Sequence, residues 1–153
     1  YPWNEMSGVI AIAEALKGNA SMTELNLDGY ALPIKQLKGT EPVASLDFRN
    51  KGLGVPSAIV IASLIGDNAS LTKILVSGNR LGDAGTTILC DALRESTVTK
   101  VQELNLFNNR IGPEGAKAVA AMAAVVASLT LVRSPAHEHS LMLPSLLPIH
   151  FAC

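Results

Sequence analysis

The stretch LTKILVSGNRLGDAGTTILCDAL, residues 71–93, limits what this chain can fold into more than any other feature. Its first half, with apolar Leu71, Ile74 and Val76, is typical of a strand. Its second half has apolar residues three and four positions apart, as in an amphipathic helix. The pattern returns thirty residues later as VQELNLFNNRIGPEGAKAVAAMA, residues 101–123. One such unit cannot bury its apolar face alone, so the pattern predicts a stack of strand–helix units.

Weaker copies of the unit precede and follow these two. The predicted strands start at positions 22, 43, 71, 101 and 126, which gives steps of 21, 28, 30 and 25 residues. In the last copy, VASLTL, we expect Val126, Leu129 and Leu131 to point inward. Between the first two copies, Pro33 and Gly39 interrupt the pattern, so residues 31–42 are predicted to form a loop with one helical turn.

The ends of the chain differ from the repeats. Residues 1–21 read as a helical half-repeat or N-terminal cap, with a helix that ends near Gly18, and residues 22–132 hold the repeats. Residues 133–153 contain three prolines and three histidines and are predicted to be an irregular tail. The tail has two interpretations, an irregular terminal cap or a sequence from an altered reading frame or a retained intron. Because the chain begins at Tyr1, we expect it to be a fragment or a processed product.

The segments LVSGNRLGDAG and LNLFNNRIGPEG resemble the leucine-rich repeat family, and the helical half is similar to its ribonuclease-inhibitor-like subclass. That subclass includes Ran GTPase-activating proteins and the sensor domains of nucleotide-binding immune receptors. The resemblance implies an α/β solenoid, a short horseshoe with a parallel sheet on the concave face and helices on the convex face. It also implies that Asn79 and Asn109 hydrogen-bond the backbone between turns. Tyr30, Lys51 and Ser134 stand at that position in the other units.

Residues that alternate with the buried leucines should line the open face of the sheet. We expect Lys73 to lie beside Glu103, and Asp28 beside Arg49. Such pairs are either ordinary surface ion pairs, worth roughly 0–1 kcal/mol each, or part of a mixed-charge recognition surface. The residues predicted to contact a protein partner are Asp28, Asp47, Arg49, Lys73, Leu75, Glu103, Asn105 and Phe107.

Leu75 and Phe107 are apolar at positions where the repeat expects a solvated side chain. Phe107 is a candidate anchor, because binding energy concentrates in a few large side chains. The alternative is that both side chains pack within the protein or under the C-terminal tail.

No motif in the sequence indicates catalysis or a bound cofactor, so the function predicted is a non-enzymatic protein-interaction module in the cytoplasm. The net charge of −1 argues against nucleic acid, and the longest apolar runs are too short to span a membrane. His137 and His139 lack further ligands for a metal. Cys90 is expected to be a buried thiol. The two Asn-Ala-Ser sequons, at Asn19 and Asn68, are expected to be turns at helix ends.

Two alternatives stay open. One is a fragment of a GTPase-activating protein similar to the Ran activators, with Arg80 and Arg110 on the rim of the sheet. The other is a partial copy of a longer repeat array, whose uncapped ends would favour homo-oligomers.

Overall fold

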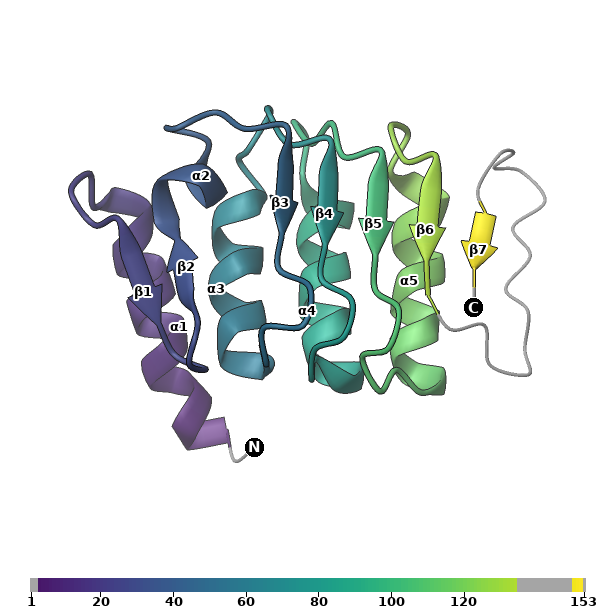
Figure 1. Cartoon of the computed structure of the whole chain (residues 1–153), viewed down its shortest axis with the longest axis horizontal. Coiled ribbons are helices and arrows are strands. Elements are labelled where there is room, and N and C mark those ends of the chain that lie inside the picture. The colour runs from purple at the N-terminus through teal and green to yellow at the C-terminus, as the bar shows by residue number, and fades with distance from the viewer. Residues whose placement is uncertain (1–2, 135–149, 153) are drawn as a thin grey trace.

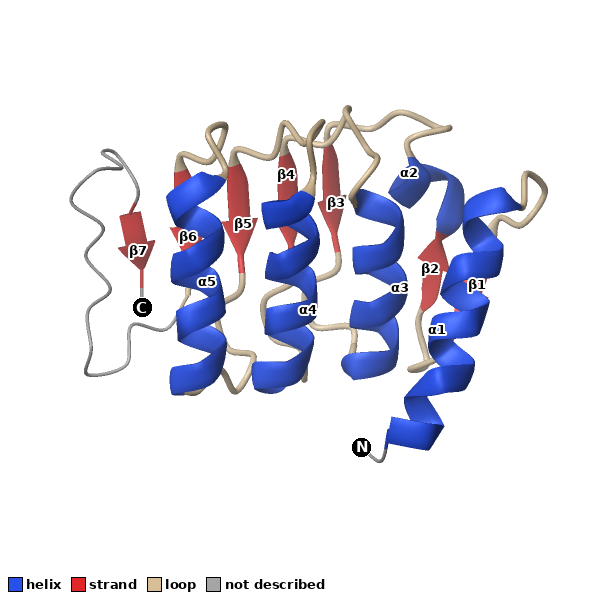
Figure 2. Cartoon of the chain, turned by 180° about the vertical axis from the view of Figure 1, so that it is seen from behind, coloured by secondary structure: helices blue, strands red, loops and turns tan. Residues whose placement is uncertain are grey.

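A computed structural model describes residues 3–134 and 150–152. Strands form one layer and helices the other, so one face of the sheet is covered and the other is open (Figure 1, Figure 2). The helices are α1 (Trp3–Gly18), α2 (Ile34–Lys38), α3 (Val55–Ile65), α4 (Gly82–Glu95) and α5 (Pro113–Val125). The strands are β1 (Glu24–Asn26), β2 (Ala31–Pro33), β3 (Ser45–Asp47), β4 (Lys73–Leu75), β5 (Glu103–Asn105), β6 (Leu131–Arg133) and β7 (His150–Ala152). This is the α/β solenoid that the repeat pattern predicts.

The main sheet is parallel and follows chain order, β3-β4-β5-β6-β7. Leu46 lies opposite Ile74, Ile74 opposite Leu104, and Leu104 opposite Val132. The paired residues are therefore 28, 30 and 28 positions apart, which is the length of one unit. Helices α3, α4 and α5 are the crossovers that join β3 to β4, β4 to β5 and β5 to β6.

The core consists of rows that take one residue from each unit. The strand centres supply Leu46, Ile74, Leu104 and Val132, and the turns that follow supply Leu53, Leu81 and Ile111, all of them buried. From the helices come buried side chains such as Ile61, Leu89 and Val119. Because every row spans several units, each unit buries its apolar side against the next, as the repeat pattern requires.

The predicted asparagine ladder is present and well formed. Asn79, which is buried, accepts hydrogen bonds from the backbone N–H groups of Lys51 and Leu53 in the preceding unit. Its amide nitrogen donates to three carbonyl oxygens, two of its own unit and one of the preceding unit. Asn109 repeats the arrangement and accepts a bond from the N–H of Leu81. These side chains satisfy buried backbone groups that no strand or helix can satisfy.

The ladder does not extend to the first units, where an aromatic contact takes its place. The ammonium group of Lys51 lies 5.3 Å from the centre of the Tyr30 ring, and that ring packs edge-on against Phe48 at a centroid distance of 6.0 Å. Both distances fit a cation–π contact and an aromatic pair, which stabilise the stack without asparagine.

The first unit departs from the expected repeat. The predicted helical turn is confirmed as α2, but Ala31–Pro33 forms a strand, β2, that was expected to be a loop. β1 pairs with β2 in an antiparallel hairpin and is not part of the parallel sheet. The step of 21 residues is too short for a full crossover helix, so the chain turns back on itself, and α2 ends at Gly39 with φ +83°.

The predicted register of the fifth strand is wrong by three residues. Leu129 and Val132 are buried, Ser134 takes the next inward position, and Leu131 lies on the open face. Ser134 therefore does not stand at the asparagine position of the ladder. α5 runs to Val125, and the turn that follows uses the N–H of Leu129 to donate to the carbonyl of Val126, so the strand begins later than the pattern VASLTL suggested.

The loops after the helices also repeat, and they explain the two sequons. Asn19 and Asn68 each accept hydrogen bonds from the backbone N–H groups two and three residues ahead. Asn68 is buried and donates its amide hydrogens to the carbonyls of Gln36 and Leu37. Its role is therefore structural, as predicted.

Thr86 in α4 offers a test of the core. It is buried, and its hydroxyl oxygen has no hydrogen-bond partner among the described residues. Thr86→Val keeps the shape and removes the unpaired hydroxyl, so the free energy of unfolding should rise by about 1 kcal/mol. Urea denaturation measures the change, with Thr97→Val at an exposed position in the loop after α4 as the control. A loss of stability would show that the hydroxyl has a partner.

Candidate protein-binding surface

The register of the sheet places the outward side chains in rows. One row runs across the strands through Ser45, Lys73, Glu103 and Leu131, and the next through Asp47, Leu75, Asn105 and Arg133. Beyond the strand ends, a backbone bond from the N–H of Gly78 to the carbonyl of Phe107 continues this register, so that Ser77 lies beside Phe107. The sequence-predicted residues, apart from Asp28, therefore share one face.

The charges on this face are mostly paired. Lys73 lies 3.2 Å from Glu103, which confirms their predicted pairing. Asp47 and Arg49 form a bidentate pair, with nitrogen–oxygen distances of 2.9 and 2.7 Å. Hydrogen bonds from the Arg49 side chain and backbone lower the pKa of Asp47 to about 2 and the same pair raises the pKa of Arg49. The Asp47–Arg49 pair is largely solvated and the Lys73–Glu103 pair is partly so. Such pairs fix the positions of the charges more than they stabilise the fold.

Asp28 was predicted to lie on the open face beside Arg49, and this is wrong. Because β1 pairs antiparallel with β2, Asp28 falls in the turn of the hairpin and points to the start of α3. Its carboxylate accepts bonds from the N–H of Gly54 and from the N–H and hydroxyl of Ser57. Asp28 is a helix cap supplied by the preceding unit, and a negative charge there also suits the helix dipole.

Asp28→Ala should therefore lower stability and leave partner binding unchanged. Three hydrogen bonds to the first turn of α3 disappear, and the buried Ser57 loses its partner. A loss of about 1–2 kcal/mol in the free energy of unfolding is expected. Asp47→Ala is the control, since its solvated carboxylate should change stability by less than about 0.5 kcal/mol. Equal effects of the two changes would contradict the capping role.

Leu75 and Phe107 remain the apolar exceptions on this face. The Phe107 side chain is 42% exposed, and Leu75 is half-buried between Asp47 and Asn105. The backbone of Phe107 is held on both sides, because its N–H donates to the side chain of Asn105 and its carbonyl accepts from Gly78. The ring is therefore exposed to solvent on a backbone that hydrogen bonds hold in place. Within the described part of the chain, the alternative that the ring is buried is wrong.

Arg133 is a candidate that the sequence pattern missed. Its side chain is exposed on β6, in register with Asn105, and makes no ion pair with a described residue. The shifted strand register hid it, because Leu129 and Leu131 were both expected to point inward. We call Leu75, Asn105, Phe107 and Arg133 the open-face patch: an aromatic ring, an aliphatic side chain, an amide and a guanidinium on four adjacent positions of the sheet.

Other kinds of site have little support. In the part of the chain that the structure describes, no cluster of three His, Cys, Asp or Glu residues could hold a metal ion, and His137, His139 and His150 lie outside the described side chains. Burial raises the pKa of Cys90 to about 12, as expected for an inert core thiol. Among the described helices none is long and apolar enough to cross a membrane.

Comparison with known proteins agrees with this architecture. Residues 99–120 match the family model described as "Leucine Rich repeat". The chain is 33% identical over 127 residues to a Ran GTPase-activating protein of Drosophila melanogaster, which covers 74% of this chain and 21% of that protein. It is 31% identical over 94 residues to the protein CARMIL of Dictyostelium discoideum, covering 54% of this chain and 9% of the relative.

A solved structure, that of leiomodin-1 actin-binding site 2, superposes with a TM-score of 0.59 at 17% identity, over 65% of this chain and 58% of the other. The repeat pattern, the parallel sheet with its asparagine ladder, and these matches define the class of protein. The chain belongs to the leucine-rich repeat family. It spans about a fifth of the length of the Ran activator and a tenth of CARMIL, so the activities of those whole proteins do not transfer to it directly.

Proposed function

We propose that the chain is a protein-interaction module that binds its partner through the open-face patch. The observation that carries the proposal is the exposed ring of Phe107 on a face where the neighbouring charges are already paired with each other. Binding hot spots favour aromatic residues and arginine on a rigid support, because little conformational entropy is lost on binding. Lys73, Glu103 and the pair of Asp47 and Arg49 would form the polar rim.

Phe107→Ala should weaken partner binding and leave the fold intact. An exposed ring contributes little to the core, so the free energy of unfolding should change by less than about 0.5 kcal/mol. Loss of a central anchor typically costs at least 2 kcal/mol of binding free energy, about thirtyfold in affinity. Affinity capture from cell extract followed by titration of a captured protein measures the second effect.

Val125→Ala is the matched control, because Val125 is an exposed apolar residue on the helix side. Leu75→Glu provides a second change within the patch. Retention of every captured protein by both patch variants would overturn the proposal. A large fall in the melting temperature of Phe107→Ala would instead place the ring in the core.

A second candidate is part of a GTPase-activating protein that acts in the cytoplasm, and the 33% identity to the Ran activator favours it. Arg80 and Arg110 are exposed in equivalent turns, 30 positions apart, and neither makes an ion pair with a described residue. Free arginines on one rim could stabilise the charge that develops on a transferring phosphoryl group. Single-turnover GTP hydrolysis by Ran, with Arg80→Ala and Arg110→Ala variants, tests this; no acceleration by the unmodified chain would exclude it for this segment.

A further inference from the structure

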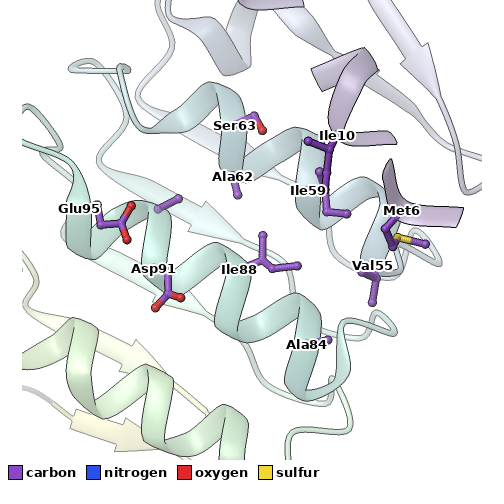
Figure 3. Close-up of a pocket in the computed structure, with 11 residues that line it drawn as sticks. Met6, Ile10, Val55, Ile59, Ala62, Ser63, Ala84, Ile88, Asp91 and Glu95 are labelled. Carbon is purple, nitrogen blue, oxygen red and sulfur yellow. The ribbon is translucent and has the colours of Figure 1, made fainter. Parts of the chain in front are cut away.

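A second surface lies on the helix side, away from the open-face patch. Helices α1, α3 and α4 enclose a groove of about 510 Å³ (Figure 3). α1 is inclined to α3 and α4 (Figure 2), and its N-terminal half supplies Met6 and Ile10 to one side of the groove. Where the regular repeat would place a full helix between α1 and α3, the shortened first unit supplies only α2, of five residues.

The groove is long rather than round. It follows α3 from Val55 to Ser63 and α4 from Ala84 to Glu95, with residues three and four positions apart along each helix. At 1.5 Å per residue these stripes are roughly 12 and 16 Å long, or about two and three turns of a helix. A third helix laid between them would fit this length and would meet side chains at its own spacing of three and four.

The chemistry of the groove changes from one end to the other. Its length is apolar, with Ile88 half-buried and Ile10 44% exposed. The end at the C-termini of α3 and α4 carries two carboxylates, Asp91 and Glu95 (Figure 3). Asp91 is paired with Arg94 at 3.4 Å, whereas Glu95 makes no ion pair with a described residue. The partial negative charge of two helix C-termini adds to this acidic end.

We propose that this groove binds an amphipathic helix of a protein partner. The helix presents apolar side chains at three- and four-residue spacing to the groove, and a lysine or arginine in its first turn to Glu95. It runs antiparallel to α3 and α4, because its N-terminus, with its partial positive charge, then lies at the acidic end. This surface is independent of the open-face patch, so the chain could hold two protein segments at once.

Two fluorescent lactam-bridged peptides of about 15 residues, long enough to hold a helix, test the proposal. They share an apolar face of leucines at positions i, i+4, i+7 and i+11 and differ only in the first turn, which carries lysines in one and glutamates in the other. Fluorescence anisotropy with the whole chain should show the lysine peptide binding about fivefold more tightly than the glutamate peptide.

Glu95→Lys should reverse this order of affinity, because the end of the groove then carries a positive charge that attracts the glutamate peptide. Glu95 is exposed, so its replacement should not disturb the core. Ser63→Trp places an indole in the groove and should weaken both peptides at least tenfold, while Phe107→Ala should affect neither. Thermal unfolding confirms that each variant is folded. The proposal is overturned if neither peptide binds, if Ser63→Trp leaves binding unchanged, or if sedimentation shows a dimer of the chain that Ser63→Trp dissociates, since a second copy would then occupy the groove. If the open-face patch proved not to bind a partner, these peptide-binding results would be unaffected.

Discussion

Asn79→Ala is expected to lower the free energy of unfolding by at least about 3 kcal/mol, a large part of the total for a domain of this kind. The side chain accepts from two N–H groups and donates to three carbonyls, and most of these groups are buried. Alanine leaves them without partners, and each unsatisfied buried group costs about 1–3 kcal/mol. Water entering the vacated space would recover part of the loss.

Asn105→Ala is the matched control, since it removes an asparagine whose side chain accepts one bond, from the N–H of Phe107. Its cost should stay below about 1 kcal/mol. Urea denaturation followed by circular dichroism gives both values. If the two asparagine variants lose similar stability, the ladder does not hold the units together in the way the hydrogen bonds indicate.

The second large effect is expected at Gly115, near the start of α5. A β-carbon there would lie 2.7 Å from the Asp83 carboxylate and 2.8 Å from the side chain of Ile111. The carboxylate of Asp83 caps α5 by accepting from the N–H groups of Gly112 and Gly115, at 2.7 and 2.9 Å. A methyl group would push it away, so Gly115→Ala should cost about 2 kcal/mol even though alanine favours helix.

Gly8→Ala in α1 is the opposite case. Apart from its chain neighbours and the backbone of its own helix, no atom of a described residue lies within 4 Å of the position its β-carbon would take. The substitution should therefore stabilise the chain by about 0.5–1 kcal/mol, through helix propensity alone. The two substitutions thus distinguish the effect of close packing, at Gly115, from that of helix propensity, at Gly8. If Gly8→Ala also destabilised the chain, helix propensity and local space would not explain these positions.

The regular units were predictable because their signals agree with one another. In residues 71–123 the strand pattern, the asparagine and the helical spacing all give the same register, and Lys73 lies beside Glu103 as expected. The fifth strand was not predictable, since VASLTL repeats the pattern of VASLDF three residues too early. The length of α5, which ends at Val125, sets the register instead and brings Arg133 to the open face.

The first unit shows a different limit. Spacing along the chain placed Asp28 on the open face, but the antiparallel pairing of β1 and β2 turns it toward α3. That pairing depends on a three-residue strand, Ala31–Pro33, which is too short to give a periodic signal. The groove lined by α1, α3 and α4 likewise depends on how these helices pack, and no local motif in the sequence marks it.

The binding proposal meets its most direct test in amide hydrogen exchange of the whole chain, measured with and without a captured protein partner. If the partner binds the open-face patch, amide exchange should slow in residues 73–78 and 103–108 when the partner is present, and most of all at Phe107. The outer turns of α4 and α5 should change little. Protection confined to the helices, with the amides of the open face unchanged, would contradict it.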